Sequence, residues 1–148
     1  MSTVKQLLAG KPGEIWSIAP NVSVYRALEL MAEKNIGALL VLEAGKLAGI
    51  ISERDYARKV ILQGRSSKTT AVDELMTPLV FHVSPEQTLE HCMALMTSKR
   101  IRHLPVLEGD RVVGIVSIGD VVKAIITEQA SAIKQLEHYI TGSGSSPQ

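Results

Sequence analysis

The sequence predicts an α+β protein built from two copies of a β-α-β-β-α half-domain, packed on each other with pseudo-two-fold symmetry. The first observation is an internal repeat: Ile36–Glu43 resembles Ile101–Glu108, and Gly49–Asp55 resembles Gly114–Asp120. Both pairs are offset by the same 65 positions, without a gap. The second observation is that helical and strand spacings of apolar residues follow one another in the same order in each copy. A single duplication indicates a pair of half-domains, because solenoids need three or more repeats.

Each copy is expected to begin with a short apolar strand, at Ile15–Ile18 and at Val80–Val83. An amphipathic helix follows, because apolar residues recur at i, i+3, i+4 and i+7, and Ser23 or Asn21 would cap it in the first copy. These positions are Val24, Ala27, Leu28 and Met31 in the first copy and Leu89, Cys92, Met93 and Met96 in the second. Cys92 is therefore expected to be a small core residue and not a nucleophile.

Two apolar runs flanking a turn then predict a β-hairpin, with Gly45 in the first turn and Asp110 in the second. A helix follows each hairpin, and Gly64 is predicted to end the first. The second helix is longer, and Gly142 is predicted to end it. Its apolar stripe comprises Val122, Ile125, Ile126, Ile133, Leu136 and Ile140. A three-stranded sheet of this size cannot bury both faces alone, so the two halves should pack together.

These elements divide the chain at the polar linker, residues 65–70. We expect a first domain over residues 1–68, including the N-terminal segment, and a second over 69–141, including the long helix. Residues 142–148 read as a flexible tail.

Composition excludes several classes of protein. The net charge of the 148 residues is only +1, and aromatic residues make up 3%, which argues against a nucleic-acid-binding protein. No stretch approaches the roughly 18 apolar residues that span a bilayer, so no membrane association is expected. A single cysteine cannot form an internal disulfide. The chain is expected to be cytoplasmic.

Ser52-x-x-Asp55 and Ser117-x-x-Asp120 occur where a strand turns into a helix, and they admit two interpretations. The structural one is a capping box, in which the serine and the acidic residue satisfy each other's backbone N–H groups. The functional one is a ligand site, because a helix N-terminus favours a phosphate and a carboxylate accepts hydrogen bonds from hydroxyl groups. Its occurrence in both copies favours the functional interpretation.

The tandem repeat resembles the CBS-domain pair, or Bateman module, over Val4 to about Ile140. The residues that carry this resemblance are Gly-h-h-Ser-x-x-Asp after each hairpin, Thr77-Pro78 after Met76, Arg102-His-Leu-Pro-Val106 and Ser52-Glu-Arg-Asp-Tyr-Ala-Arg-Lys59. The resemblance implies a non-catalytic sensor that binds AMP, ADP or ATP in clefts between the repeats, with NAD(H) as an alternative ligand. It also implies that ligand occupancy is reported to a protein partner, which the sequence does not identify.

The resemblance assigns ribose binding to Asp55 and Asp120 and places Ser52 and Ser117 near the phosphate. It implies that Arg102 and His103 reach across to the Asp55 site, whereas their counterparts Gly37 and Ala38 carry no charge at the Asp120 site. Trp16 and Phe81 are either core residues or contacts to adenine, and Lys11 is either solvated or close to a phosphate. The candidate ligand-binding residues are Lys11, Trp16, Gly37, Ala38, Ser52, Arg54, Asp55, Phe81, Arg102, His103, Ser117, Ile118, Gly119 and Asp120.

Three further expectations concern metal binding, catalysis and assembly. The four histidines lack metal-ligand spacing, so neither a metal site nor a catalytic cofactor is predicted. No activated nucleophile is recognised, so the chain is not expected to be an enzyme, and an interaction protein with vestigial clefts stays open as an alternative. A homodimer is expected through the helices that follow the hairpins, whose apolar residues two small half-domains leave uncovered. Those residues are Tyr56, Val60, Val121 and Ile125.

Overall fold

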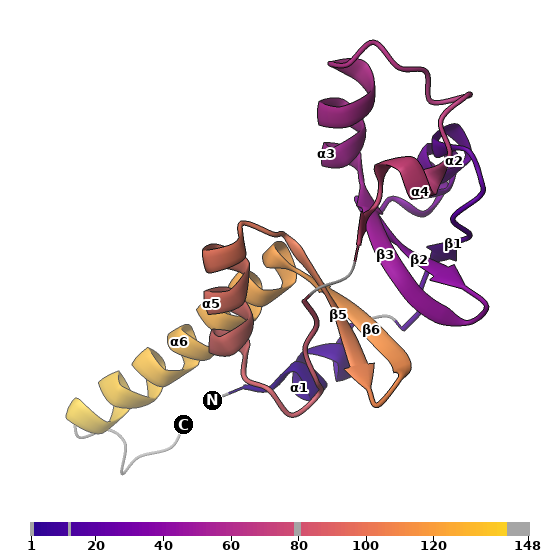
Figure 1. The fold of residues 1–148 in the computed structure, drawn as a ribbon. Helices are drawn as coiled ribbons and strands as arrows, with labels where there is room; N and C mark the ends of the chain where they lie inside the picture. Colours follow the sequence, from indigo (N-terminus) through magenta and orange to yellow (C-terminus); the bar gives the residue numbers. More distant parts are fainter. Residues whose placement is uncertain (1, 12, 79–80, 142–148) are drawn as a thin grey trace. The chain divides into compact units, whose positions relative to one another are not determined.

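The computed structural model describes residues 2–11, 13–78 and 81–141, and Figure 1 shows its helices and strands along the chain. The chain divides into two compact units. The first-repeat unit combines Glu14–His82 with Pro105–Ile115, and the second-repeat unit combines Met1–Gly13, Val83–Leu104 and Val116–Gln148. Helices and strands alternate in both repeats, which confirms the α+β class and the tandem organisation.

The first-repeat unit is built on a four-stranded sheet with the order β1-β2-β3-β4. Strand β1 runs parallel to β2, and the other neighbouring strands are antiparallel. Its elements are β1 (Ser17–Ile18), α2 (Val24–Lys34), β2 (Ala38–Glu43), β3 (Lys46–Ser52), α3 (Glu53–Tyr56), the π-helical turn η1 (Ala57–Ile61), α4 (Val72–Leu75) and β4 (Thr77–Pro78). The hairpin β2–β3 turns at Ala44 and Gly45, both at positive φ, as a two-residue hairpin loop requires.

Helix α2 forms where the apolar spacing predicted it, and Ser23 is its N-cap. The Ser23 hydroxyl accepts a hydrogen bond from the N–H of Arg26. Val24, Ala27 and Met31 are buried and pack in one core with Leu39 and other residues of the sheet. Burying this apolar face is what holds the helix on the sheet, because a helix of this length is marginal on its own.

Part of the helix after β3 is π-helical, which the spacing did not predict. The N–H of Leu62 donates to the carbonyl of Ala57, five residues earlier. The helix ends as expected near Gly64, which has a φ of 69° and donates its N–H to Ile61.

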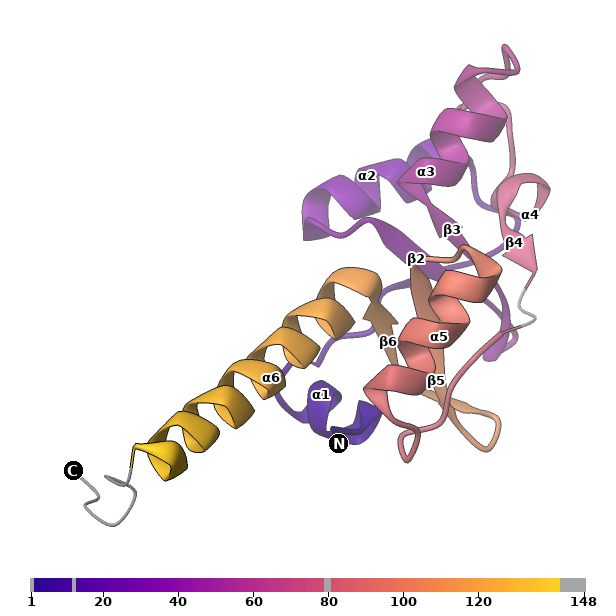
Figure 2. The same ribbon diagram turned by 90° about the vertical axis from the view of Figure 1, so that its left-hand side faces the viewer.

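In the second-repeat unit, α5 (Leu89–Lys99) and α6 (Ile118–Ile140) lie side by side, and α1 (Val4–Ala9) packs near α6 (Figures 1 and 2). The second hairpin consists of β5 (His103–Glu108) and β6 (Arg111–Ser117), and most of it, Pro105–Ile115, belongs to the first-repeat unit. Of the strand expected at Val80–Val83, Val80 lies outside the described residues, and Phe81 and His82 are not in a strand. Val83 forms an isolated β-bridge, and the chain turns directly after it, where the N–H of Ser84 donates to the Gln87 side chain. The expected tail, residues 142–148, also lies outside the described residues.

The packing differs from a division of the chain at residue 68. Residues 71–78, which follow the linker, pack on the first repeat: Val72 and Leu75 lie in its core, and β4 pairs with β3. The N-terminal segment packs on the second repeat, where the N–H groups of Val4 and Lys5 donate to the carbonyls of Gln87 and Pro85. In both cases the added segment donates N–H groups to carbonyl groups of the repeat and adds a buried valine, Val72 or Val4, to its core.

The helices that follow the hairpins expose different residues from those expected for a dimer. Val60 and Val121 are buried, with exposed fractions of 1% and 0%, because they face the cores of their own repeats. The exposed apolar side chains of these helices include Ile61 and its repeat counterpart Ile126, at 56% and 59%.

The chain at Met76 and Thr77 packs so closely on Gly49 of β3 that there is no room for a side chain at this position. A Cβ atom at this position would lie 2.7 Å from the Thr77 carbonyl oxygen and 2.9 Å from the Met76 sulfur. Gly49→Ala should therefore lower the free energy of unfolding by about 1–3 kcal/mol, measured by urea denaturation. Gly13→Ala is the control, because nothing lies within 4 Å of its Cβ position. Equal midpoints for the two variants would contradict this packing of β4.

Candidate ligand-binding sites

The two Ser-x-x-Asp motifs form the same junction between a strand and a helix. Ser52 caps α3 and Ser117 caps α6, each with an extended backbone. The serine hydroxyl accepts from the aspartate N–H, at 3.2 Å for Asp55 and 3.1 Å for Asp120. In return, Oδ2 of each aspartate accepts from the serine N–H at 3.1 Å. Both motifs are therefore complete capping boxes, as the structural interpretation of the sequence predicted.

A carboxylate that takes part in a capping box can still accept further hydrogen bonds. An ionised carboxylate offers about four lone-pair positions, and the serine N–H occupies one of them. Each aspartate can therefore hold the start of its helix and accept further donors, such as hydroxyl groups or ammonium groups.

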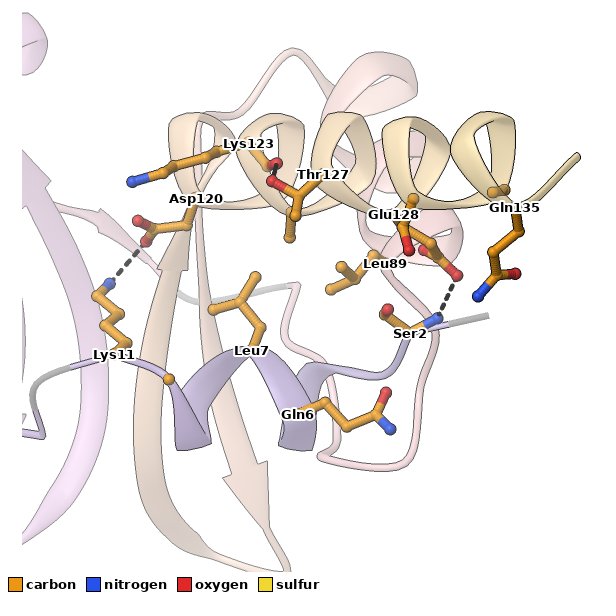
Figure 3. Close-up of a pocket in the computed structure, with 14 residues that line it drawn as sticks. Ser2, Gln6, Leu7, Lys11, Leu89, Asp120, Lys123, Thr127, Glu128 and Gln135 are labelled. Atoms are coloured by element: carbon orange, nitrogen blue, oxygen red, sulfur yellow. Dashed lines mark hydrogen bonds and ion pairs between the residues drawn. The ribbon is translucent and has the colours of Figure 1, made fainter. Parts of the chain in front are cut away.

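At the second junction, that further donor is Lys11. Its Nζ donates to Oδ2 of Asp120 at 2.7 Å, and the two side chains are 34% and 32% exposed (Figure 3). Burial acts to raise the pKa of Asp120, but the hydrogen bonds from Lys11 and Ser117 and the charge of Lys11 outweigh it. The pKa of Asp120 therefore lies below its ordinary value of 3.8. This carboxylate is ionised and held next to a cation from the N-terminal segment.

At the first junction, the cation comes from the same helical segment. Lys59 Nζ lies 3.8 Å from Oδ1 of Asp55 and also donates to the carbonyl of Leu75 at 3.4 Å. Lys59 was not among the candidate ligand-binding residues. Its position four residues after Asp55 is the spacing at which opposite charges meet on a helix, and that signal could have identified it. Arg54, beside Asp55, has an exposed side chain on α3.

The residues just before β2 and β5 contact the junction of their own repeat. The carbonyl of Gly37 accepts from the N–H of Glu53 at 3.1 Å, and the carbonyl of Arg102 accepts from the N–H of Ile118 at 2.8 Å. Ala38 pairs with Ser52 across the hairpin. The structure thus brings Arg102 next to Ile118, and both line a groove with Gly119.

The predicted contacts between repeats join residues of different units. Arg102 and His103 belong to the second-repeat unit and Asp55 to the first, whereas Gly37 and Ala38 belong to the first and Asp120 to the second. The assignment of these residues to shared clefts stays a prediction.

The two candidate aromatic contacts lie in the first-repeat unit. Trp16 is half-buried against its core, and Lys34 Nζ lies 4.3 Å from the centre of the Trp16 ring. Phe81 is also half-buried. Trp16 has a place in the core whether or not its ring also contacts a ligand.

A groove of about 740 Å³ runs between α1 and α6, with the Lys11–Asp120 pair at one end (Figure 3). Ser2, Gln6 and Glu128 also line it, and the N–H of Ser2 donates to Glu128 at 3.1 Å. None of these three residues was predicted as part of a site. The signal that could have placed α1 is Thr3-x-x-Gln6, which forms a capping box.

The part of the chain that the structure describes also bears on metal binding, thiol chemistry and membrane crossing. These residues contain no group of three or more His, Cys, Asp or Glu side chains placed to hold one metal ion. Cys92 is buried on α5, and burial raises the pKa of its thiol. Among the same residues, no helix combines the length and apolarity that crossing a bilayer requires.

Comparison with known proteins identifies the class. Residues 13–61 and 72–127 match the family model of the CBS domain, so the chain belongs to the CBS-domain family and carries two copies of the domain. A mitochondrial CBS domain-containing protein of Arabidopsis thaliana, CBSX3, is 47% identical over 81% of this chain. The chain spans 61% of the length of that relative.

Solved structures support the same assignment. A protein with CBS domains from Burkholderia ambifaria MC40-6 is 54% identical, with a TM-score of 0.83 over 86% of this chain and 96% of that one. The CBS domain pair of protein MJ0100 is 28% identical, with a TM-score of 0.76 over 86% of this chain and 98% of that one. It was solved in complex with 5′-methylthioadenosine and S-adenosyl-L-methionine.

The Lys11–Asp120 pair gives a prediction that depends on pH. Lys11→Met should raise the pKa of Asp120, because burial of the carboxyl is then less opposed. A lowered pKa in the folded state stabilises the protein above the unfolded value, and this stabilisation is lost as the pH falls through the folded pKa. The variant should therefore be less stable than wild type at neutral pH, and the difference should shrink in acid.

Carboxyl NMR titration measures the pKa, and urea denaturation at several pH values measures the stability. Lys5→Met, on the exposed face of α1, is the control and should leave the pKa of Asp120 unchanged. If both variants gave the wild-type pKa for Asp120, the ion pair would not exist in solution.

Proposed function

We propose that this CBS-domain pair is a regulatory module that binds adenine nucleotides (AMP, ADP or ATP) at its two Ser-x-x-Asp junctions and reports their occupancy to a partner protein. The observation that supports this most is the repetition of the junction, with a capped helix start, an ionisable carboxylate and a lysine beside it. The adenosine-containing ligands of the MJ0100 pair support the same class of ligand. The proposal assigns no catalytic step to the chain.

The carboxylates suit the ribose. Asp55 and Asp120 each keep one oxygen on the capping box, and their remaining lone pairs accept the two ribose hydroxyls. At the Asp120 site, Lys11 holds the carboxylate when no ligand is bound. We infer that the ribose hydroxyls replace Lys11 as donors to Asp120 when ligand binds, and that Lys11 then moves to a phosphate oxygen. Asp120 keeps hydroxyl donors in this arrangement, and the phosphate gains a charged donor.

The cations suit the phosphate groups, and their distribution differs between the sites. The Asp55 site has Lys59 and Arg54 from its own repeat, and the family resemblance adds Arg102 and His103. The Asp120 site has Lys11 but Ile118 and Gly119 at the start of its helix. The Asp55 site is therefore proposed to bind charged phosphate groups more tightly.

An interaction protein with unused clefts is the second candidate function. The observation that favours it is that each capping box is complete without a ligand, so the Ser-x-x-Asp motif has a structural role of its own. NAD(H), which also carries an adenosine, is the alternative ligand within the sensing function. A cytoplasmic location stays a prediction, which cell fractionation would test.

A second copy of the chain is the protein partner that we propose first. The exposed apolar side chains of the two helices that follow the hairpins favour a homodimer. These side chains are Ile61, Leu62, Val122 and Ile126, with exposed fractions of 56%, 79%, 38% and 59%.

The aspartates distinguish the two candidate functions. Asp55→Ala and Asp120→Ala should each abolish nucleotide binding at one site and lower the free energy of unfolding by about 1 kcal/mol through the lost cap. Calorimetric titration with AMP, ATP and NADH measures the binding. Mass spectrometry of the nucleotide released by denaturing a separate sample of purified protein identifies any ligand that is already bound. Asp110→Ala, in the exposed hairpin turn, is the control. If the variants melted well below wild type but bound nucleotide normally, the motif would be a cap alone.

Arg102 tests the inequality of the two sites. Titration of wild type with ATP should show two affinities, and added salt should weaken the tighter one more, because it rests on charged contacts. Arg102→Ala should weaken the tighter event about tenfold or more and spare the other. Arg111→Ala removes an exposed arginine that pairs with Glu108 and serves as the control. Two equal sites in wild type would contradict the assignment.

A further inference from the structure

The C-terminal half of α6 stands apart from the rest of its unit. Every residue from 129 to 141 is exposed, and this part of the helix projects past α1 and α5 (Figures 1 and 2). A helical segment of this length is marginal in water unless its apolar side is covered. Its own unit leaves this apolar side uncovered, so a further contact would stabilise the segment.

One side of α6 carries six residues at alternating spacings of four and three, and all but one are apolar. This spacing is typical of the contact between two helices of a coiled coil. We call this set the α6 stripe: Val122, Ile126, Gln129, Ile133, Leu136 and Ile140. Its apolar members are 38–70% exposed. At 100° per residue the stripe lies opposite the face of α6 that lines the groove with α1, which includes Ala124 and Ser131. The stripe is therefore accessible.

We propose that the α6 stripe pairs in antiparallel orientation with the α6 stripe of a second copy of this chain. In this register Val122 packs against Ile140 of the second copy, and Ile126 packs against Leu136. The arrangement is self-complementary, as a two-fold interface requires. Gln129 lies near the two-fold axis, where a single polar residue in an apolar seam fixes the register and the orientation.

The charges beside the stripe select the antiparallel orientation. Lys123 and Glu137 flank the stripe on the same side, and within the described part of the chain neither of them forms an ion pair. In the antiparallel register Lys123 faces Glu137 of the second copy, and the contact occurs twice by symmetry. In a parallel pair, like charges would lie at the same height, and the opposite charges would be about 21 Å apart along the axis.

A groove at the start of the stripe supports the same arrangement. It has a volume of about 670 Å³, and Ile118, Val122 and Ile126 line its apolar part. This is where the end of the second copy's helix arrives in the antiparallel register. The C-terminal end of a helix carries partial negative charge, and Lys123 at the edge of the groove complements it.

Cross-linking tests the pairing directly, independently of nucleotide binding and of any other dimer contact. Ala130→Cys places a thiol beside the stripe and near the two-fold axis, and a short bis-maleimide should link two copies. Ser131→Cys is the matched control, because the next residue lies on the opposite face. The native Cys92 is buried, and wild type should not cross-link. Equal cross-linking at 130 and 131, or none at 130, would overturn the proposal.

Charge exchange tests the orientation. Lys123→Glu and Glu137→Lys alone should each raise the dimer dissociation constant about fivefold or more, measured by analytical ultracentrifugation and by cross-linking of the Ala130→Cys protein. The double variant should restore both readouts. A double variant as weak as the single ones would overturn the antiparallel register, and so would a monomeric protein whose stripe binds phospholipid vesicles. Nucleotide affinity measured on the same variants reports separately on the proposed function.

Discussion

Each repeat depends on a short segment that closes its core from outside the repeated unit. In the first repeat, Val72 donates its N–H to the carbonyl of Val22 at 2.8 Å, and in the second, Val4 donates to Gln87 at 2.9 Å. Both valines are fully buried. These bonds give partners to carbonyl groups just before α2 and α5. Because α1 is fixed in this way, the chain that follows it brings Lys11 to Asp120, so the electrostatics of the second junction depends on the closure.

The internal repeat at an interval of 65 residues was enough to predict most of the fold. The buried faces of α2 and α5, the two hairpins and both Ser-x-x-Asp junctions follow from it, because apolar periodicity and turn chemistry act locally. It could not predict α1 and α4. Their shared pattern, Val4-x-x-Leu7 and Val72-x-x-Leu75, repeats at an interval of 68, and only tertiary packing makes such short helices stable. Periodicity also could not show that Val121 is buried and Ile126 exposed, since this depends on how the long helix meets α5.

The candidate site shows the same limit. Serine and aspartate at the start of a helix were predictable, because a capping box is a local structure. The cations were not equally predictable. Lys59 is visible in the spacing of one helix, whereas Lys11 comes from a segment 109 residues away in sequence. The junctions are thus identical in their caps and different in their charges, so any difference in ligand preference between them has to come from the residues that the repeat does not share.

Helix α6 connects the features that the repeat does not explain. Its first turn contains Asp120, its proximal part packs on α5 and α1, and the α6 stripe runs along its exposed side from Val122 to Ile140. A single helix transmits displacement along its length more faithfully than a loop does, because its backbone hydrogen bonds keep it stiff. If a ligand at Asp120 releases Lys11 and shifts the first turn of α6, the shift moves the α6 stripe, which begins two residues after Asp120. Thermodynamic linkage then makes the effect reciprocal: pairing through the stripe changes ligand affinity at Asp120 by the same factor by which the ligand changes pairing.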